Sequence, residues 1–560
     1  MYATVFISFI ACSDEFTDST LTGQLSDESL QSELGVNLLL TGTYSAMDLG
    51  DTGGFRASGD NWWQDAISDD AHKGSTDGDQ QELLQLELFQ WNTSNRYLIE
   101  QWTGLFAGAN RANSVLTLIS SIEGGPETFA PQFAEARFLR AHFNFELTKM
   151  YGFVPFISEQ NYADTEFNQP NEVQIWDQIE ADYAFAVENL PPVQEEVGRA
   201  NSWAAKAFLA KAHLFQEEWS QALTIFTDVI NSGPYELLPN YNDNFRLTGE
   251  NGPESIFAIQ FVPDGAASFN GNSGGTLNFP HGGAAPFSNC CGFFQPTIDL
   301  VNAFQTDGNG LPIFDRAGMP DFKNTYLVAD SEPFELDNSP IDPRMDFTAG
   351  RRGIDYQGYG ENPGQAWVRA TSTDFAGPYL PRKHIWHKED GANIPGSGRN
   401  SGVNHHFMRY SDVLLMAAEA LVESGGSLGT ATQYVNMVRN RVKTGAKVQA
   451  VEGSGDAANY VIEPYLTDFA SPEEAIQAIR FERRLEFAME GKRLADISRW
   501  GPDGVEIMNS YIEREKPSLT QAAVSIGNLN NTFEARFRYF PIPQNAIDLS
   551  GNILGQNEGY

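Results

Sequence analysis

The chain has 560 residues, of which 41% are hydrophobic, and its 74 acidic and 36 basic side chains give a formal net charge of −38. A surface this acidic repels nucleic acid and anionic lipid headgroups, so neither is expected as a partner. Acidic disordered chains are poor in aromatic residues, whereas this chain has 39 Phe, 19 Tyr and 10 Trp. Composition therefore predicts a folded, acidic and aromatic-rich protein.

The chain begins with an apolar segment from Tyr2 to Ala11 that ends directly before Cys12. An apolar run that ends in a small residue before a cysteine is typical of a bacterial lipoprotein signal, with residues 9–12 as the lipobox and Cys12 as the lipidated residue. The segment is short and lacks the basic residues that open a signal peptide, which leaves open a start further upstream. The alternative is a buried N-terminal strand with a core cysteine. No later stretch reaches the ~18 apolar residues of a membrane-spanning helix, so we expect membrane attachment through the lipid anchor alone.

Residues from about 36 to 235 are mainly helical in pattern. In the clearest pair, Asn201 or Ser202 can cap the first helix, residues 216–220 form the turn, and Gly233-Pro234 ends the second helix. Its small and large residues fall at the positions of a tetratricopeptide repeat, namely Leu209, Ala210, Ala222, Phe226, Val229 and Pro234. Weaker helices are predicted at 99–119, 133–151, 173–190 and 410–441.

Residues 236–405 differ, because Gly, Asn, Pro and Ser interrupt short strand-like runs such as 255–261. Long loops are expected at 271–287, 340–365 and 391–403, and their aromatic content favours a functional role.

The adjacent Cys290 and Cys291 do not form a C-x-x-C pair, so zinc or thioredoxin-like chemistry is not indicated. Two free thiols are favoured over a strained vicinal disulfide.

The last region returns to a helical pattern. Ser471-Pro-Glu-Glu474 is a strong helix start, with a serine cap, a proline in the first turn and a glutamate that can close a capping box. We expect this helix to run to about Arg499. It carries charges of both signs at helical spacing, which indicates a lattice of ion pairs and not a catalytic set; the residues are Arg480, Glu482, Arg483, Arg484, Glu486, Glu490 and Arg493.

Four segments in chain order resemble the SusD/RagB family of surface glycan-binding lipoproteins. They are residues 135–155 (EARFLRAHFNFELTKMYGFVP), 409–420 (RYSDVLLMAAEA), 479–501 (IRFERRLEFAMEGKRLADISRWG) and 541–560, which starts PIPQNAID and ends QNEGY. Together with the Cys12 signal, the resemblance spans essentially the whole chain.

The resemblance implies a mainly α fold of tetratricopeptide-like helical hairpins with an inserted, loop-rich subdomain of short strands. The expected parts are a signal at 1–12, an N-terminal helical part at 13–235, the loop-rich subdomain at 236–405, and a C-terminal helical part with a tail at 406–560. The resemblance also implies an outer-membrane lipoprotein at the cell surface that binds oligosaccharides or polysaccharides without cleaving them. Its partner would be a SusC-like TonB-dependent transporter, over which it acts as a lid.

Sugar binding needs flat apolar surfaces for the ring faces and a few polar groups for the hydroxyls. The densest candidate is the early segment with Asn61, Trp62, Trp63, Asp69, Asp70 and Lys73. One member of an adjacent Trp pair is usually in the core. A second candidate set comes from the inserted region: Phe287, Tyr356, Tyr359, Trp367 and Trp386. The net charge favours a neutral glycan unless Arg351, Arg352, Arg369, Arg382 and Lys383 form a local basic patch.

Two other functions remain open on sequence alone. A glycoside hydrolase needs two carboxylates about 5–10 Å apart, and 74 acidic residues do not exclude such a pair. A tetratricopeptide-like scaffold could bind peptides, although long insertions disfavour it.

No cofactor is expected. Asp77-Gly-Asp79 and Asp307-Gly-Asn309-Gly310 cluster oxygen ligands but lack the EF-hand spacing, so a structural calcium ion is only weakly indicated.

Overall fold

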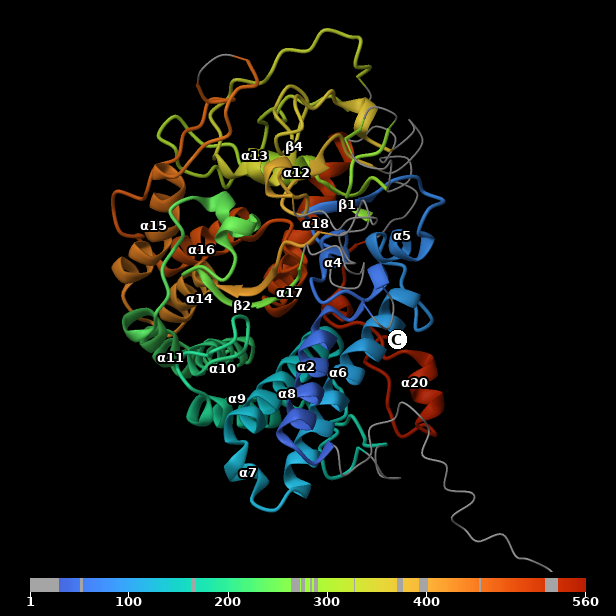
Figure 1. Cartoon of the computed structure of the whole chain (residues 1–560). Coiled ribbons are helices and arrows are strands. Elements are labelled where there is room, and N and C mark those ends of the chain that lie inside the picture. Colours follow the sequence, from blue (N-terminus) through green and yellow to red (C-terminus); the bar gives the residue numbers. More distant parts are fainter. Residues whose placement is uncertain are drawn as a thin grey trace, which may run out of the picture.

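Nine long helices pack one after another along the body of the molecule (Figure 1). The computed structural model describes residues 30–50, 54–162, 168–262, 272, 277–282, 285–286, 291–326, 328–369, 376–391, 401–452, 455–518 and 532–560. The predicted signal with Cys12, and also Phe287 and Cys290, lie outside these ranges. The nine helices are α2 (Glu33–Ser45), α6 (Arg96–Ser121), α8 (Ala130–Tyr151), α9 (Trp176–Asn189), α10 (Ser202–Phe215), α11 (Trp219–Ser232), α14 (Tyr410–Glu423), α15 (Leu428–Thr444) and α16 (Pro472–Phe487).

The predicted tetratricopeptide-like hairpin is confirmed in α10 and α11, which pack directly against each other. Asn201 caps α10, since its side-chain oxygen accepts a hydrogen bond from the Ala204 N–H at 2.9 Å. Ala210 and Ala222 are fully buried, as close helix packing requires of the small positions. The helices predicted at 99–119, 133–151 and 173–190 are confirmed as α6, α8 and α9.

Two predictions of long continuous helices were wrong. The 410–441 segment is two helices, because Gly425 adopts a left-handed conformation (φ 74°) and Ser427 caps α15 through the Thr430 N–H. The helix that begins at Ser471 ends at Phe487, and α17 (Arg493–Arg499) begins only after a break. At this break Gly491 has a φ of 69°, and a Cβ there would lie 2.1 Å from the Asp60 carbonyl oxygen. A tertiary contact with the early segment therefore sets the break.

Further helices surround this body: the long α18 (Pro502–Ser518) and the short α4 (Trp62–Asp65), α5 (Gln81–Glu87), α7 (Gly125–Thr128), α12 (Ile298–Ala303), α13 (Arg344–Thr348) and α20 (Gln544–Leu549). The described strands form three two-stranded antiparallel pairs. β1 (Ala71–Gly74) pairs with β3 (Phe293–Pro296), β2 (Ser255–Ile259) with β6 (His405–Arg409), and β4 (Ala349–Gly350) with β5 (Leu380–Pro381). Because β1 and β3 are far apart in sequence, their pairing ties the early segment to the inserted region.

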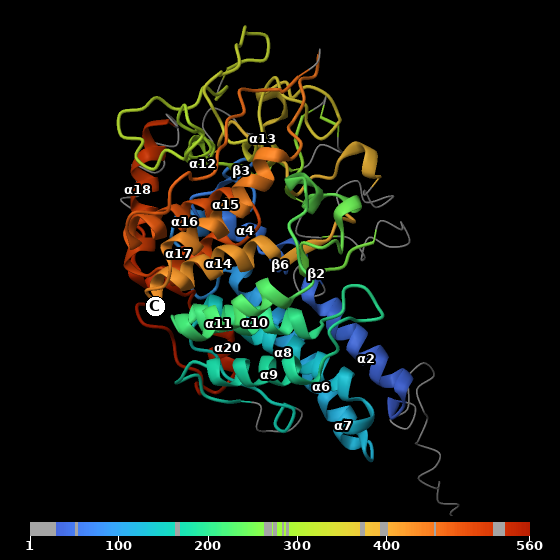
Figure 2. The same ribbon diagram turned by 90° about the vertical axis from the view of Figure 1, so that its left-hand side faces the viewer.

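The inserted region lies over one end of the helical body (Figures 1 and 2) and has a small core of its own. Phe279, Tyr356, Trp367, Val368, Leu380, Ile385 and Trp386 form this core.

Cys291 is disulfide-bonded, which corrects the expectation of two free thiols. None of the described helices is both long and apolar enough to span a membrane.

Candidate functional site

The two adjacent tryptophans of the early segment point into different surroundings. Trp63 is 1% exposed and packs between the rings of Tyr97 and Phe540, with centroids 5.7 and 5.8 Å away. Trp62 lies instead against the ring of His384 (3.6 Å) and edge-on to that of His405 (5.7 Å). Trp63 is therefore the core member of the pair, and Trp62 belongs to a polar environment.

Asn61 fixes α4, which carries both tryptophans, on the helical body. It adopts a left-handed conformation with a φ of 58°, and its amide donates to the Glu146 carboxylate at 3.2 Å. Its carbonyl oxygen accepts from the side-chain amides of Gln64 (2.9 Å) and Gln101 (3.1 Å). Its hydrogen-bonding capacity is thus used to position Trp62 and Trp63.

Asp69 and Asp70 are fully buried and paired with arginines of α16 and α17. The Arg493 guanidinium forms a fork with Asp69 at 2.7 and 2.9 Å, and Arg484 binds Asp70 at 3.1 Å. Burial opposes ionisation of Asp69, but the charges of Arg484 and Arg493 outweigh it and hold the pKa of Asp69 well below its usual value. Lys73 is equally buried and donates to three backbone carbonyl groups at 2.8 to 3.0 Å. All three side chains face protein partners in this structure.

The aromatic side chains predicted in the inserted region lie close together, mostly inside its small core. Tyr356 is fully buried, donates its hydroxyl hydrogen to the Pro381 carbonyl and meets Trp367 edge-on at 5.7 Å. Trp386 packs on Phe279 at 4.9 Å. Tyr359 is half-buried at the edge, with the Lys388 ammonium group 5.9 Å from its ring centre. Phe287 lies outside the described residues.

Trp62 and Trp386, one from each predicted set, line the same small recess between the helical body and the inserted region. We call it the Trp62 recess; its other described lining residues are Phe245, Lys383, His384, Ile385, Ser401, Val403, Asn404, His405, His406 and Glu490. Sequence reasoning missed its three histidines. The available signal was the position of His384 two residues before Trp386 and the adjacent pair His405-His406.

The three histidines of the recess are held in the neutral form. Burial lowers the pKa of His405 to about 3 and that of His406 to about 4, and it holds the pKa of His384 well below its usual value. The His406 Nε2 atom lies 3.1 Å from the Asn244 carbonyl oxygen. Because a carbonyl oxygen only accepts, Nε2 carries the hydrogen and Nδ1 is left as an acceptor.

Several polar atoms of the recess have no partner within the part of the chain that the structure describes. They are the indole nitrogen of Trp62, Nε2 of His384 and Nδ1 of His406, all of them buried. A buried donor or acceptor without a partner costs about 1–3 kcal/mol. The recess has a volume of about 30 Å³, which is room for one water-sized group. Its tryptophan rings lie beside at least one free donor and one free acceptor, which a single hydroxyl group can satisfy.

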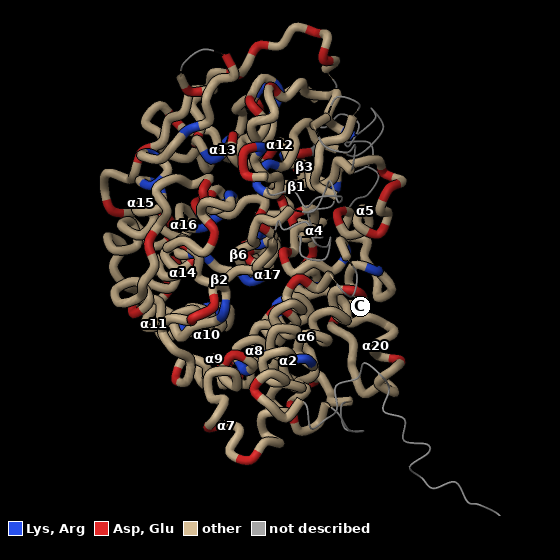
Figure 3. Tube along the Cα trace, in the orientation of Figure 1, with Lys and Arg blue, Asp and Glu red and all other residues tan. Residues whose placement is uncertain are grey.

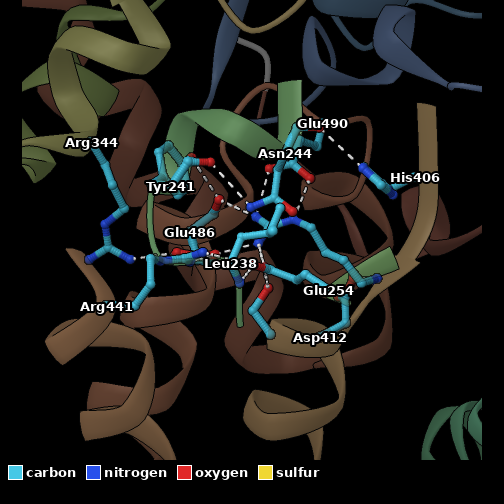
Figure 4. Close-up of polar contacts among 12 residues, drawn as sticks. Leu238, Tyr241, Asn244, Glu254, Arg344, His406, Asp412, Arg441, Glu486 and Glu490 are labelled. Atoms are coloured by element: carbon cyan, nitrogen blue, oxygen red, sulfur yellow. Dashed lines mark hydrogen bonds and ion pairs between the residues drawn. The ribbon is translucent and has the colours of Figure 1, made fainter. Parts of the chain in front are cut away.

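A buried ion network (Figure 4) adjoins the recess through Glu490, which lines the recess and belongs to the network. Lys383 donates to the Glu490 carboxylate at 2.9 Å and to the backbone carbonyl groups of Glu486 and Ala488. The network consists of Arg344, Arg409, Arg441, Glu254, Glu486 and Glu490. These positions lie on β6, α13, α15 and α16 and in adjoining loops, where basic and acidic positions gather inside the molecule (Figure 3).

Arg409 is the centre of this network. It binds Glu254 at 2.9 Å, Glu490 at 3.0 Å and Glu486. Burial opposes ionisation of Glu486, but the neighbouring guanidinium groups of Arg441, Arg409 and Arg344 hold its pKa well below the usual value. The predicted lattice of ion pairs is confirmed. Most partners, however, come from other elements and not from the same helix.

The five basic residues that could favour an anionic glycan do not form a free basic patch. Arg351 pairs with Asp346, Arg369 with Asp79, and Lys383 with Glu490, at 2.7 to 2.9 Å. Arg352 and Arg382 donate to backbone carbonyl groups at 2.7 and 2.8 Å. Three of the five charges are therefore paired with carboxylates, and the side chains of the other two are directed at carbonyl groups of the chain.

The two segments in which calcium was weakly indicated use their carboxylates within the protein, in a turn and in an ion pair. The Asp307 carboxylate accepts from the backbone N–H groups of Asn309 and Leu311, and Asp79 pairs with Arg369. Among the described residues, a group with metal-ligating atoms close together is Glu180, His213 and Glu218 on the helical body. It lies far from these two segments in the sequence.

Comparison with known proteins matches the two halves of the chain. A family model described as the SusD family matches residues 253–560, and one described as starch-binding associating with outer membrane matches residues 24–214. SusD-like protein P25 of Formosa agariphila is 26% identical over 72% of this chain and 70% of its own length. SusD-like protein P2 of the same organism is 23% identical over 100% of this chain and 99% of its own length.

Solved structures share the fold. A SusD-like protein from Bacteroides fragilis has a TM-score of 0.70 and 22% identity, covering 96% of this chain and 99% of its own. Surface glycan-binding protein A from Bacteroides thetaiotaomicron, in complex with laminarihexaose, has a TM-score of 0.65 and 21% identity over 94% and 99%. The SusD family model alone covers more than half of the sequence, and the mainly α architecture agrees with it. The chain belongs to the SusD family.

Proposed function

We propose that this protein binds a neutral oligosaccharide or polysaccharide at the cell surface, and that the Trp62 recess supplies ligand contacts. The observation that carries the proposal is the combination of tryptophan rings with buried ring nitrogens that lack partners among the described residues. Hydroxyl groups of a sugar both donate and accept, so they satisfy such atoms. Arg351, Arg369 and Lys383 are already paired with carboxylates of the chain. This pairing supports a neutral ligand over an anionic one.

Family membership supports the wider role. SusD-like neighbours are named for laminarin binding and as surface glycan-binding proteins, and the family model over residues 24–214 is described as associating with the outer membrane. We propose that Cys12 carries the lipid anchor. The protein then delivers its glycan to a SusC-like TonB-dependent transporter, which it covers as a lid.

A binding role is favoured over glycoside hydrolysis by the carboxyl chemistry of the recess. A glycosidase needs a carboxylic acid whose pKa is raised so that it can donate a proton. Glu490 is the carboxylate among the described lining residues. Burial opposes its ionisation, but the charges of Arg409, Lys383 and Lys492 hold its pKa well below the usual value. Glu490 therefore stays ionised and is unsuited to act as the acid.

The test is binding of neutral polysaccharides, beginning with laminarin, by isothermal titration calorimetry and affinity electrophoresis. We expect Trp62→Ala and Trp386→Ala each to weaken binding about tenfold or more, since ~1.4 kcal/mol of lost ring contact equals a factor of ten. The control is Trp219→Ala on the distant helix α11, which should bind like the parent. Unchanged binding in both recess variants would exclude this site, and release of reducing sugar would establish a hydrolase instead.

A further inference from the structure

A second and much larger hollow lies on another part of the molecule and takes no part in the proposed sugar contact. It is a groove of about 1610 Å³ between α16, α18, α12 and the loop of residues 313–321. In Figure 2, α18 lies at the edge of the molecule with α12 and α16 beside it. We call this hollow the α16–α18 groove. The bottom of the groove is the buried cluster of Asp69, Asp299, Arg484 and Arg493.

The walls of the groove are apolar over a substantial area. Ile476 and Phe481 come from α16, Ile507 from α18, and Phe314 and Met319 from the facing loop. Met319 is 41% exposed, and the other four side chains are half-buried. Apolar side chains that line a hollow of this size are typical of a surface that another molecule covers.

The rim of the groove is acidic. Ten carboxylates and five arginines occur among the described lining residues of the whole groove, and Asp69, Asp299, Arg484 and Arg493 of these lie at its bottom. The arginines are largely neutralised: Arg480 binds Asp503 at 2.6 Å and Arg514 binds Asp299 at 2.5 Å. Glu473 and Glu506 are exposed on opposite walls, on α16 and α18. The excess negative charge favours an occupant that carries lysine or arginine.

The aromatic rings of the groove are poorly placed for stacking on sugar. Trp500 is 6% exposed, and the guanidinium groups of Arg480, Arg493 and Arg499 lie 4.8 to 5.4 Å from its ring centre. Phe314 and Phe481 meet each other edge-to-face at 5.2 Å. The walls therefore present mainly aliphatic groups and phenyl edges, which suit protein side chains better than the face of a sugar ring.

We propose that the α16–α18 groove binds a short cationic, apolar-faced helix of another protein. A helix about 10 Å wide that rises about 1.5 Å per residue fills about 120 Å³ per residue, so the groove has room for roughly a dozen residues. Its apolar face packs on Ile476, Ile507 and Met319, and its basic side chains reach Glu473 and Glu506. A second copy of this chain is disfavoured as the occupant, because two bodies of charge −38 repel each other.

The test uses the full chain and a labelled helical peptide of about fourteen leucine and lysine residues, with its leucines on one face, in fluorescence anisotropy. We expect the double reversal Glu473→Lys/Glu506→Lys to weaken binding about tenfold or more. The matched control is the reversal Glu123→Lys/Glu127→Lys. Glu127 lies on the distant helix α7 and Glu123 just before it, and both are exposed. This reversal should change affinity less than about twofold.

Met319→Asp separates docking in the groove from general attraction between a cationic peptide and an acidic protein. It adds a negative charge at an exposed position, so general attraction would strengthen binding. Docking in the groove would instead weaken it about fivefold or more, because a charge then faces the apolar side of the helix. Stronger binding of this variant, or equal loss in the α7 control, would overturn the proposal. Displacement of the peptide by a glycan, or self-association of the parent that Met319→Asp abolishes, would assign the groove to sugar or to a second copy.

Discussion

The ion network around Arg409 and the Trp62 recess share Glu490 and lie side by side, yet they treat buried polar groups in opposite ways. In the network, buried carboxylates face guanidinium groups at hydrogen-bonding distance. In the recess, ring nitrogens of Trp62, His384 and His406 have no partner among the described residues. The polar groups of both regions are buried, so burial by itself does not distinguish them. The presence or absence of partners separates the groups that hold the fold together from those that we propose as ligand contacts.

Removal of Arg409 should have the largest effect. Arg409→Met leaves Glu254, Glu486 and Glu490 buried with fewer cations, and breaking a buried ion pair from one side costs about 3–5 kcal/mol. We expect the free energy of unfolding in urea to fall by this amount, or the protein to become insoluble. The control is Arg96→Met, whose exposed pair with Glu100 contributes at most ~0.5 kcal/mol. Equal stability of the two variants would show that the network is not the support we describe.

His72 gives a second test of paired burial, because it is charged where the recess histidines are neutral. Its two ring nitrogens lie 2.9 Å from carboxylate oxygens of Glu87 and Glu515. Burial opposes its charge, but hydrogen bonds and the charges of these two carboxylates raise its pKa to about 9. This stabilisation is fully present below pH 6.5 and is lost as pH rises through about 9, and its size is roughly 3 kcal/mol.

We expect the stability difference between the parent and His72→Gln to be largest near neutral pH and to shrink between pH 7 and 10. Urea unfolding across this range measures it. A difference that stays constant with pH would mean that His72 is not the titrating group. This outcome would leave the geometry of β1 and α18 intact. It would contradict the stabilisation of a charged His72 by Glu87 and Glu515.

His406 should respond to pH in the opposite direction and to a similar extent. Its pKa is lowered to about 4 by burial, so the neutral form stabilises the fold above pH 6.5, and this contribution is lost as pH falls through about 4. The parent should therefore lose more stability than His406→Gln when the pH falls from 7 to 4. Parallel stability curves for the two proteins would contradict a neutral, buried His406. Weaker glycan binding on the acid side would agree with the recess as the ligand site.

Trp62→Phe should have the smallest effect on stability and the clearest functional meaning. The substitution removes the buried indole N–H that lacks a partner, so the lost ring contacts are partly offset. We expect the free energy of unfolding to change by less than about 1 kcal/mol while glycan affinity falls. Thermal unfolding and calorimetry on the same samples separate the two effects. A large loss of stability would move Trp62 from the ligand site to the core.

Local sequence patterns predicted much of the helical body. The apolar periodicity, the Asn201 and Ser471 caps and the small residues of the α10–α11 hairpin act within a few residues, so their consequences could be inferred before any fold was known. The early tryptophan pair could be selected for the same reason. The break at Gly491 could not be inferred, because it depends on contact with Asp60, more than four hundred residues earlier in the sequence.

The sequence by itself determined the family, the mainly α architecture and the charged character of residues 480–493. The tertiary structure alone decided which charges pair and which polar groups are left free. Asp69 and Asp70 were attractive as sugar contacts until the fold placed Arg484 and Arg493 against them. His384, His405 and His406 gave no strong local signal, yet the fold gathers them around Trp62. Helix formation follows from neighbours in the chain, whereas the electrostatic state of a buried group follows from neighbours in space.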